Sequence, residues 1–260
     1  MNQKIKIISV KDLADPPFNL LLSYPKVDRN RITSLVDKLA QAGVSYIHLD
    51  GETQISGLRL LGKGCTSIVF EAIFKNKPSA VKVLRTDADR ATLRNEAEFL
   101  EKVNILSIGP RLHYVSDEFI IMELVRGPPI FNFITAIKGK GTARRTRLLI
   151  SDILSQCFVL DQKNIAHCEL SNPTKHIIIK DYKKPVIIDF ESASLNKKYS
   201  NVTSLAQSLF IGGKYAPRIR RMIGIKNTQE VIRDLREYKQ KTNQISFNKI
   251  LNTLKLTPKQ

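Results

Sequence analysis

The first half of the chain alternates short apolar and polar runs in the way that antiparallel strands do. Between Ser56 and Arg85 this alternation stands on both sides of a glycine-rich turn and returns after "KNKP", which indicates strands joined by tight turns. Residues 87–104 then carry an apolar stripe at helical spacing. Residues 111–125 give two more strands around a short polar turn. This half is therefore predicted to be rich in β-structure.

After a Gly-Pro-Pro stretch in the middle of the chain, the period changes to that of helices. Residues 144–164 and three later segments carry apolar side chains at helical spacing. Two short strands, 177–179 and 186–188, stand between them. We therefore predict an α+β fold with two lobes, a β-rich one at residues 55–127 and an α-rich one at residues 128–260.

Residues 1–54 form a predicted helical extension. Its central part, residues 28–43, reads as an amphipathic helix with Asp28 as the N-cap and Gly43 as the stop. A strand-like segment, "VSYIHLDG", follows. Two interpretations stay open: the end of a winged helix that contacts nucleic acid, or a helical brace packed on the β-rich lobe.

The charge of the chain adds a possible class of partner. Lysine and arginine exceed aspartate and glutamate by 18, and such a balance attracts nucleic acid, a ribonucleoprotein surface, an acidic protein or anionic lipid. A generally lysine-rich proteome would give the same number. Much of the excess lies in the second half, where Arg218, Arg220 and Arg221 near Tyr215 make a plausible phosphate-contacting surface. RNA or a ribosomal particle is therefore a possible partner.

Composition also bears on location. No apolar run approaches the length of a membrane span, so no membrane partner is expected. The N-terminus lacks the apolar region of a secretory signal. The three cysteines show neither metal-ligand nor disulfide spacing. We expect a cytoplasmic protein.

Several segments of the β-rich half could carry chemistry, and each also has an ordinary structural explanation. The "GKG" that begins at Gly62 could let backbone N–H groups approach a phosphate, or could be only a turn. Lys82 stands inside an apolar strand, so it either reaches solvent at an edge or meets a buried anion. Glu96, fourteen positions later, could pair with it or be a solvated helix acid. The strand end at Met122-Glu123 could expose backbone groups to a purine edge, or be an ordinary strand end.

In the α-rich half, Glu169 and Asp189 each stand beside an apolar run, with a tight polar connection between them. In chain order, the features are a glycine-rich hairpin, "AVK", a helix glutamate, "MELV", "HCEL" and "IIDFE". This is the order and approximate spacing of the protein-kinase signature set. From residue 55 to residue 210, the chain thus resembles the protein-kinase-like superfamily, and most closely the compact atypical archaeal Ser/Thr kinases near the RIO and Bud-type families.

The resemblance implies ATP and Mg²⁺ as cofactors and a role for each matching residue. Lys82 would bind the α- and β-phosphates and pair with Glu96. Asp189 would hold Mg²⁺, and Glu169 would accept the proton of the substrate hydroxyl, so Lys82, Asp189 and Glu169 are the expected catalytic residues. The residues implied in nucleotide binding are Gly62, Gly64, Ser67, Val69, Ala80, Lys82, Glu96, Met122, Glu123, Val125 and Ile188. His167 resembles the structural histidine of the catalytic loop.

Departures from the family pattern put two of these roles in doubt. Glu169 replaces the usual aspartate, so its backbone must sit about an ångström further back to keep hydrogen-bond reach. The metal-binding asparagine is missing. The pattern favours His176 as the second metal residue beside Asp189, although hard cations prefer oxygen ligands. Lys175 or Asn172 could take this place instead.

The segment after Asp189 is also unusual. "DFE" replaces "DFG", so a glycine that permits flipping is absent and a more fixed magnesium site is expected. There is no "APE" sequence, so the peptide-positioning segment is missing or tiny, as in RIO-like kinases. An extended peptide substrate is therefore in doubt, and the site is expected to be open.

We expect an ATP-dependent Ser/Thr protein kinase that phosphorylates protein hydroxyls and also itself. The nearby candidate acceptors are Ser192, Ser194, Ser200 and Thr203. One alternative is an ATP-switched assembly factor for RNA or ribosomes with weak kinase or ATPase activity, and another is a small-molecule phosphotransferase.

Overall fold

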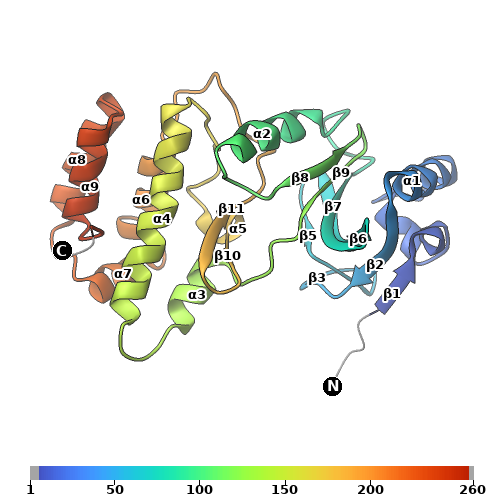
Figure 1. The fold of residues 1–260 in the computed structure, drawn as a ribbon, viewed down its shortest axis with the longest axis horizontal. Coiled ribbons are helices and arrows are strands. Elements are labelled where there is room, and N and C mark those ends of the chain that lie inside the picture. The colour runs from blue at the N-terminus through green and yellow to red at the C-terminus, as the bar shows by residue number, and fades with distance from the viewer. Residues whose placement is uncertain (1–5, 258–260) are drawn as a thin grey trace. The chain divides into compact units, whose positions relative to one another are not determined.

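The computed structural model describes residues 6–257, which belong to two compact units (Figure 1). The first unit comprises Met1–Asn104 and Pro110–Leu124, and the second comprises Ile105–Gly109 and Val125–Gln260. Strands dominate the first unit and helices the second, so the predicted α+β class is confirmed. The domain boundaries predicted after residues 54 and 127 stay predictions.

An antiparallel sheet forms the centre of the first unit. Its strands run in the order β1 (Lys6–Ser9), β2 (Val44–Leu49), β6 (Ser67–Phe74), β7 (Lys77–Leu84), β9 (Phe119–Glu123) and β8 (Leu112–Val115), and β5 (Gly62–Lys63) also pairs with β6. Lys75 and Asn76 join β6 to β7 with positive φ angles of 46° and 63°, which suits a two-residue hairpin turn. A separate hairpin pairs β3 (Thr53–Ile55) with β4 (Leu58–Leu60).

The predicted helix near the N-terminus is confirmed. Helix α1 (Arg29–Ala42) begins at Asp28, whose carboxylate accepts from the Arg31 N–H, and ends at Gly43 with a φ of 107°. The 3-10 helices η1 (Val10–Ala14) and η2 (Phe18–Leu21) precede it. Its apolar stripe packs into one core with the inner face of the sheet. Residues 6–49 thus also supply two strands, β1 and β2, to that sheet.

Helix α2 (Arg94–Ile105) follows β7, and its buried side chains include Ala97, Leu100 and Val103, the stripe that the sequence indicates. The Leu93 N–H donates to the carbonyl of Asp117, 2.9 Å away, which ties the start of the helix to the turn between β8 and β9. The start of α2 is therefore fixed to the sheet that carries Lys82.

Helices form most of the second unit. They are α3 (Ile130–Ala136), α4 (Thr142–Gln162), the single turn α5 (Pro173–His176), α6 (Asn201–Phe210), α7 (Ala216–Ile223), α8 (Thr228–Gln240) and α9 (Gln244–Thr253). The long helix α4 lies beside α6 and α7 (Figure 1). Strands β10 (Ile177–Lys180) and β11 (Lys184–Ile187) form a hairpin in which Ile177 lies opposite Ile187. Their residue ranges overlap those of the two strands predicted at 177–179 and 186–188.

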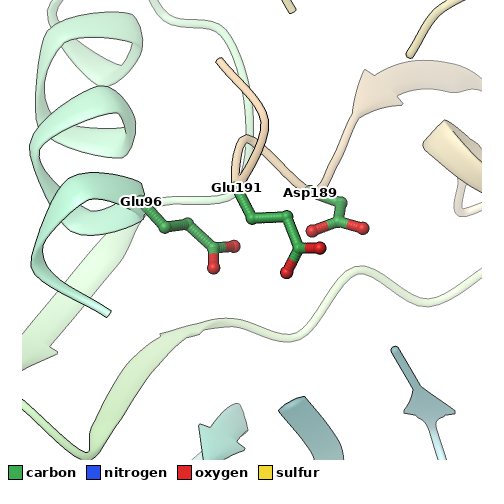
Figure 2. Close-up of side chains that lie close together, drawn as sticks. All are labelled: Glu96, Asp189 and Glu191. Carbon is green, nitrogen blue, oxygen red and sulfur yellow. The ribbon is translucent and has the colours of Figure 1, made fainter. Parts of the chain in front are cut away.

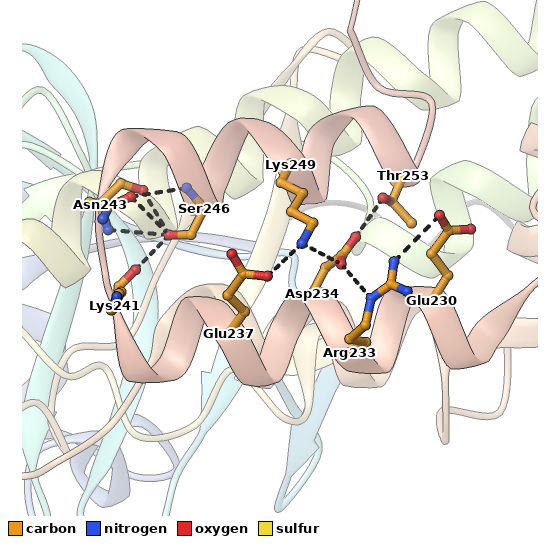
Figure 3. Close-up of polar contacts among 9 residues, drawn as sticks. All are labelled: Glu230, Arg233, Asp234, Glu237, Lys241, Asn243, Ser246, Lys249 and Thr253. Atoms are coloured by element: carbon orange, nitrogen blue, oxygen red, sulfur yellow. Dashed lines mark hydrogen bonds and ion pairs between the residues drawn. The ribbon is translucent and has the colours of Figure 1, made fainter.

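The last two helices are joined by polar contacts that we call the hairpin clasp, formed by Asp234, Glu237, Lys249 and Thr253 (Figure 3). The Asp234 side chain is 1% exposed. It accepts a hydrogen bond from the Thr253 hydroxyl at 2.6 Å and lies 3.5 Å from Lys249 Nζ. Lys249 also reaches Glu237 at 2.5 Å. Side chains of α8 and α9 thus meet on both sides of one buried carboxylate.

Candidate active site

In the first unit, Lys82 and Glu96 form a buried ion pair. Lys82 lies on the interior strand β7, between Val69 on β6 and Ile120 on β9, and is 4% exposed. Glu96 lies in the first turn of α2 (Figure 2) and is 1% exposed. Lys82 Nζ is 2.9 Å from one Glu96 carboxylate oxygen and 2.7 Å from the other. The contact expected from the sequence is therefore present, and the edge position considered for Lys82 is excluded.

A buried ion pair needs a reason other than stability. Removing two charges from water costs several kcal/mol per ion, and their attraction offsets this only with good geometry and further hydrogen bonds. An apolar pair would stabilise such a core at least as well. The Lys82–Glu96 pair is thus more readily explained by a function for the lysine charge than by the packing of the sheet.

The glycines of the β5–β6 turn have no packing reason to be glycine. The Gly64 N–H donates to the Ser67 carbonyl at 2.8 Å. A Cβ atom added at Gly62 would meet nothing within 4 Å, and one at Gly64 would meet Ser67 only at ordinary contact distance. At Gly51, by contrast, a Cβ would lie 1.7 Å from a backbone oxygen. Gly62 and Gly64 therefore border open space that a bound group could enter.

The other predicted nucleotide-binding residues are placed by the strands. Ser67 and Ala80 are buried on β6 and β7, Val69 is half-buried, and Met122 and Glu123 end β9 half-buried. The Glu123 N–H donates to the Arg111 carbonyl at 2.8 Å. Because this donor is used within the unit, a purine contact from the Glu123 backbone would have to use its carbonyl. Val125 and Ile188 belong to the second unit.

In the second unit, His167 is a buried structural residue. Its backbone N–H donates to Asn201 Oδ1 at 3.0 Å, and its ring Nε2 lies 3.0 Å from the Ile188 carbonyl. A carbonyl can only accept, so Nε2 carries the ring proton in this contact. Burial lowers the pKa of His167 to about 4, which keeps the ring neutral at pH 7. His167, two positions before Glu169, thus contacts Ile188, the residue before Asp189.

Glu169 is held by two side chains. The Ser192 hydroxyl donates to Oε1, and His176 Nε2 lies 3.0 Å from Oε2. The Glu169 side chain remains 36% exposed, so solvent or a substrate hydroxyl can approach it. A carboxylate oriented in this way can accept a proton from a hydroxyl group.

His176 lies between two carboxylates. It is 3% exposed, and its Nδ1 is 3.9 Å from Asp189 Oδ2 with no hydrogen-bond partner among the described residues. A neutral imidazole nitrogen without a hydrogen-bond partner is free to accept a proton donor or a metal ion. The side chains of the alternatives, Lys175 and Asn172, are exposed. The choice among the three residues stays a prediction.

Glu191 is a candidate that the sequence interpretation missed. Asp189 and Glu191 extend from the segment after β11 (Figure 2), and a carboxylate oxygen of each lies within 4.8 Å of the other. Oxygen-rich pairs of this kind suit Mg²⁺ better than an imidazole does. The "DFE" sequence contained the signal, because it places a second acid only two positions after the predicted metal residue Asp189.

Two strained backbone positions support the group of Glu169, His176, Asp189, Glu191 and Ser192, which we call the loop cluster. Cys168 has a φ of 71° and Asp189 a φ of 67°, in the left-handed region that non-glycine residues adopt at a cost. The two hydrogen bonds of His167 lie next to these positions. Strain of this kind clusters at functional sites.

The half-buried carboxylate of Asp161 connects the loop cluster to the C-terminal helices. Asp161 accepts from the backbone N–H and the side-chain amide of Asn201, both at 2.7 Å, and from the Tyr238 hydroxyl at 3.0 Å. Burial raises the pKa of Asp161, although these hydrogen bonds oppose the shift. The Asn201 amide also donates to the Ile165 carbonyl at 2.8 Å. Helix α8 is thereby linked to the loop that carries His167 and Glu169.

Comparison with known proteins finds a similarity to a protein kinase. No protein-family model matches the chain. The serine/threonine-protein kinase dkf-2 of Caenorhabditis briggsae is 25% identical over 154 residues, which make up 55% of this chain and 13% of that protein. The chain thus spans 13% of the curated relative's length. Among residues 6–257, no helix combines the length and apolar composition needed to cross a bilayer. The similarity indicates a distant relationship to Ser/Thr protein kinases over about half of the chain.

Proposed function

We propose that this protein is an ATP- and Mg²⁺-dependent Ser/Thr protein kinase that phosphorylates protein hydroxyls and also itself. The observation that carries the proposal is the buried pair of Lys82 and Glu96 on an interior strand and the adjoining helix. In protein kinases, a pair of this kind positions a lysine on the nucleotide phosphates. The similarity to a Ser/Thr kinase over about half of the chain supports the same conclusion.

In this proposal, the first unit binds the nucleotide. The open space beside Gly62 and Gly64 would admit the phosphates to the backbone. Lys82, with its side chain oriented by Glu96, would neutralise the α- and β-phosphates. The end of β9 at Met122 and Glu123 would contact the purine.

The metal would be held mainly by the second unit. Asp189 and Glu191 supply carboxylate oxygens that fit Mg²⁺, and His176 either approaches the metal through Nδ1 or orients a metal-bound water. When bound, Mg²⁺ would neutralise the charge of the β- and γ-phosphates. The two acids would thus perform the role that an aspartate and an asparagine share in ordinary kinases.

Glu169 would act as the base for the acceptor hydroxyl. Its contact with His176 holds one carboxylate oxygen, and the hydrogen bond from the Ser192 hydroxyl to the other oxygen supports a role in accepting a hydroxyl group. The proton would pass from the acceptor hydroxyl to Glu169 as the hydroxyl oxygen attacks the γ-phosphorus. The bond from the γ-phosphorus to the oxygen that bridges it to the β-phosphate would break, and ADP would leave with that oxygen. The proposal also requires the two-lobed kinase arrangement, in which both units act on one nucleotide.

Transfer of a radiolabelled γ-phosphate from ATP to a generic protein acceptor, and to the protein itself, tests the proposal. We compare the wild type with Glu169→Gln, which keeps the shape of the side chain but cannot take the proton. Loss of a general base typically costs about 10²- to 10⁴-fold in rate. The matched control is Asp181→Asn, which removes an exposed acid from the turn between β10 and β11 and should transfer phosphate at the wild-type rate.

The possible outcomes separate the alternatives. Equal rates for the wild type and Glu169→Gln would remove Glu169 from the mechanism. ATP binding without transfer by the wild type would contradict kinase activity and favour the ATP-switched assembly factor. Phosphorylation of a sugar with none of any protein would favour a small-molecule phosphotransferase.

A further inference from the structure

Much of the excess positive charge of the chain lies in two segments of the second unit that contain no acid. Residues 124–151 contain six lysines and arginines and no acid, and residues 192–229 contain seven and no acid. These thirteen charges (6 + 7) compare with a net charge of +18 for the whole chain. The two segments are far apart in the sequence, so the fold decides whether their charges lie together.

The fold brings the two segments into contact. The rings of Phe131 on α3 and Tyr215 before α7 lie 4.4 Å apart. Arg218 on α7 donates to the Thr135 carbonyl at 2.8 Å, and Arg147 on α4 donates to the Ile223 carbonyl at 2.8 Å. Helices α3 and α7 and the start of α4 therefore lie side by side, at the lower end of α4 in Figure 1.

The exposed cations at this end form what we call the basic end. Its members are Lys138, Lys140, Arg144, Arg145, Lys214, Arg218 and Arg221. Arg147 and Arg220 are half-buried and donate to backbone carbonyls of Ile223 and Phe210, so they serve mainly to fix the helices. Lys140, Arg144 and Arg221, by contrast, have no acidic partner among the described residues. Their mutual repulsion is uncompensated within the unit, and an external anion would relieve it.

We propose that the basic end binds the phosphodiester backbone of a nucleic acid. The surface lacks what other partners need. Protein interfaces have an apolar centre, and the only large exposed apolar side chain on the first turns of α4 is Leu148. Insertion into a membrane would need an exposed apolar helix face, whereas Ala216, Ile219 and Ile223 of α7 are buried. Arginine and lysine without acids, spread over several elements, instead match a chain of phosphates.

The inference does not depend on kinase activity, and it is tested by binding. The probe is a fluorescent single-stranded RNA of about 20 nucleotides, long enough for several phosphate contacts, and the full chain is titrated between about 50 and 200 mM salt. We compare the triple variant Lys140→Gln, Arg144→Gln, Arg221→Gln with the wild type. The matched control is Lys11→Gln, Arg29→Gln, Lys77→Gln, which removes the same three charges from exposed positions of the first unit. Circular dichroism checks that each variant folds.

The wild type should bind with an affinity that falls steeply with salt. Each lost phosphate contact lowers the slope of log K against log salt by about 0.7 for a single strand, so the basic-end variant should lose about two units of slope and at least about tenfold in affinity. The control should lose less than about twofold. An equal-length DNA probe tells whether the backbone alone is recognised or the 2′-hydroxyl contributes.

Three results would overturn the inference: no salt-dependent binding of the wild type at low salt, equal losses in the two triple variants, or competition by polyglutamate of the same total charge as effective as competition by RNA. The last result would assign the surface to an acidic protein instead.

Discussion

The second unit contains two clusters of polar side chains, the hairpin clasp and the loop cluster, in which carboxylates have different surroundings. In the hairpin clasp, Asp234 is 1% exposed and lies among donors from both helices. In the loop cluster, Glu169 and Asp189 are 36% and 35% exposed, and each approaches His176 on one side. A carboxylate used for stability is buried among its donors, whereas one available for chemistry is oriented on one side and open on another. The difference predicts which substitutions should affect activity and which should affect stability.

The largest expected effect is on activity, at Asp189. Asp189→Asn keeps the size of the side chain but removes the charge that would hold the metal, and loss of one such electrostatic contact costs at least about 100-fold in rate. Because the side chain is 35% exposed, the urea midpoint followed by circular dichroism should change little. Full phosphate transfer by this variant would show that the loop cluster is not a metal site.

The second effect is on stability and depends on pH. Burial lowers the pKa of His167 from 6.5 to about 4, with a smaller contribution from His176, while the Ile188 carbonyl and the carboxylates of Asp189 and Glu169 oppose the shift. Above pH 6.5 the ring is neutral in both the folded and unfolded chain. As the pH falls below 6.5, the unfolded chain takes up a proton that the folded chain refuses until about pH 4, so folding stability falls across this window by about 3 kcal/mol.

Urea unfolding at several pH values between 7 and 4, in the presence of a chelator, measures this loss. His167→Gln should flatten the pH dependence in this window. The matched control is His113→Gln. Partial desolvation also lowers the pKa of His113, but the residue is exposed, unlike His167. This variant should therefore keep most of the pH dependence. An unchanged slope in His167→Gln would show that another group titrates there.

The sequence predicted these elements unequally. Helix α1 and the strands β10 and β11 were found because their caps, turns and periods are local signals. The contact of Lys82 with Glu96 was one of two possibilities that the residues left open, and the resemblance to protein kinases favoured it. The roles of Asn201 and Ser192 could not be found in this way. Each depends on a partner 23 to 40 positions away in the sequence, and only the packing of α6 and the loop brings those partners together.

The third effect concerns the hairpin clasp. Asp234→Ala removes the buried carboxylate that accepts a hydrogen bond from Thr253 and pairs with the charge of Lys249. It should lower the free energy of unfolding by about 2 kcal/mol. Phosphate transfer per folded molecule should stay near the wild-type rate, because the hydrogen bonds and ion pairs of the clasp side chains join α8 to α9 and reach no member of the loop cluster among the described residues. Lys239→Ala, at an exposed position on α8, is the control and should leave stability within about 0.5 kcal/mol.

The smallest effect tests whether the two regions are independent. Tyr238 lies on α8, and its hydroxyl donates to Asp161. Asp161 also accepts from the Asn201 amide, and the Asn201 side-chain carbonyl oxygen accepts from the His167 N–H. Tyr238→Phe removes this one hydrogen bond and should cost about 1 kcal/mol of stability. The bonds from Asn201 to Asp161 remain, so the loop should keep its place and the rate of phosphate transfer should fall less than about threefold. A much larger loss of rate at unchanged stability would mean that α8 positions Glu169 through Asp161. The stabilising carboxylates of the C-terminal helices and the reactive ones of the loop cluster would then belong to one hydrogen-bond network, connected through Asp161 and Asn201.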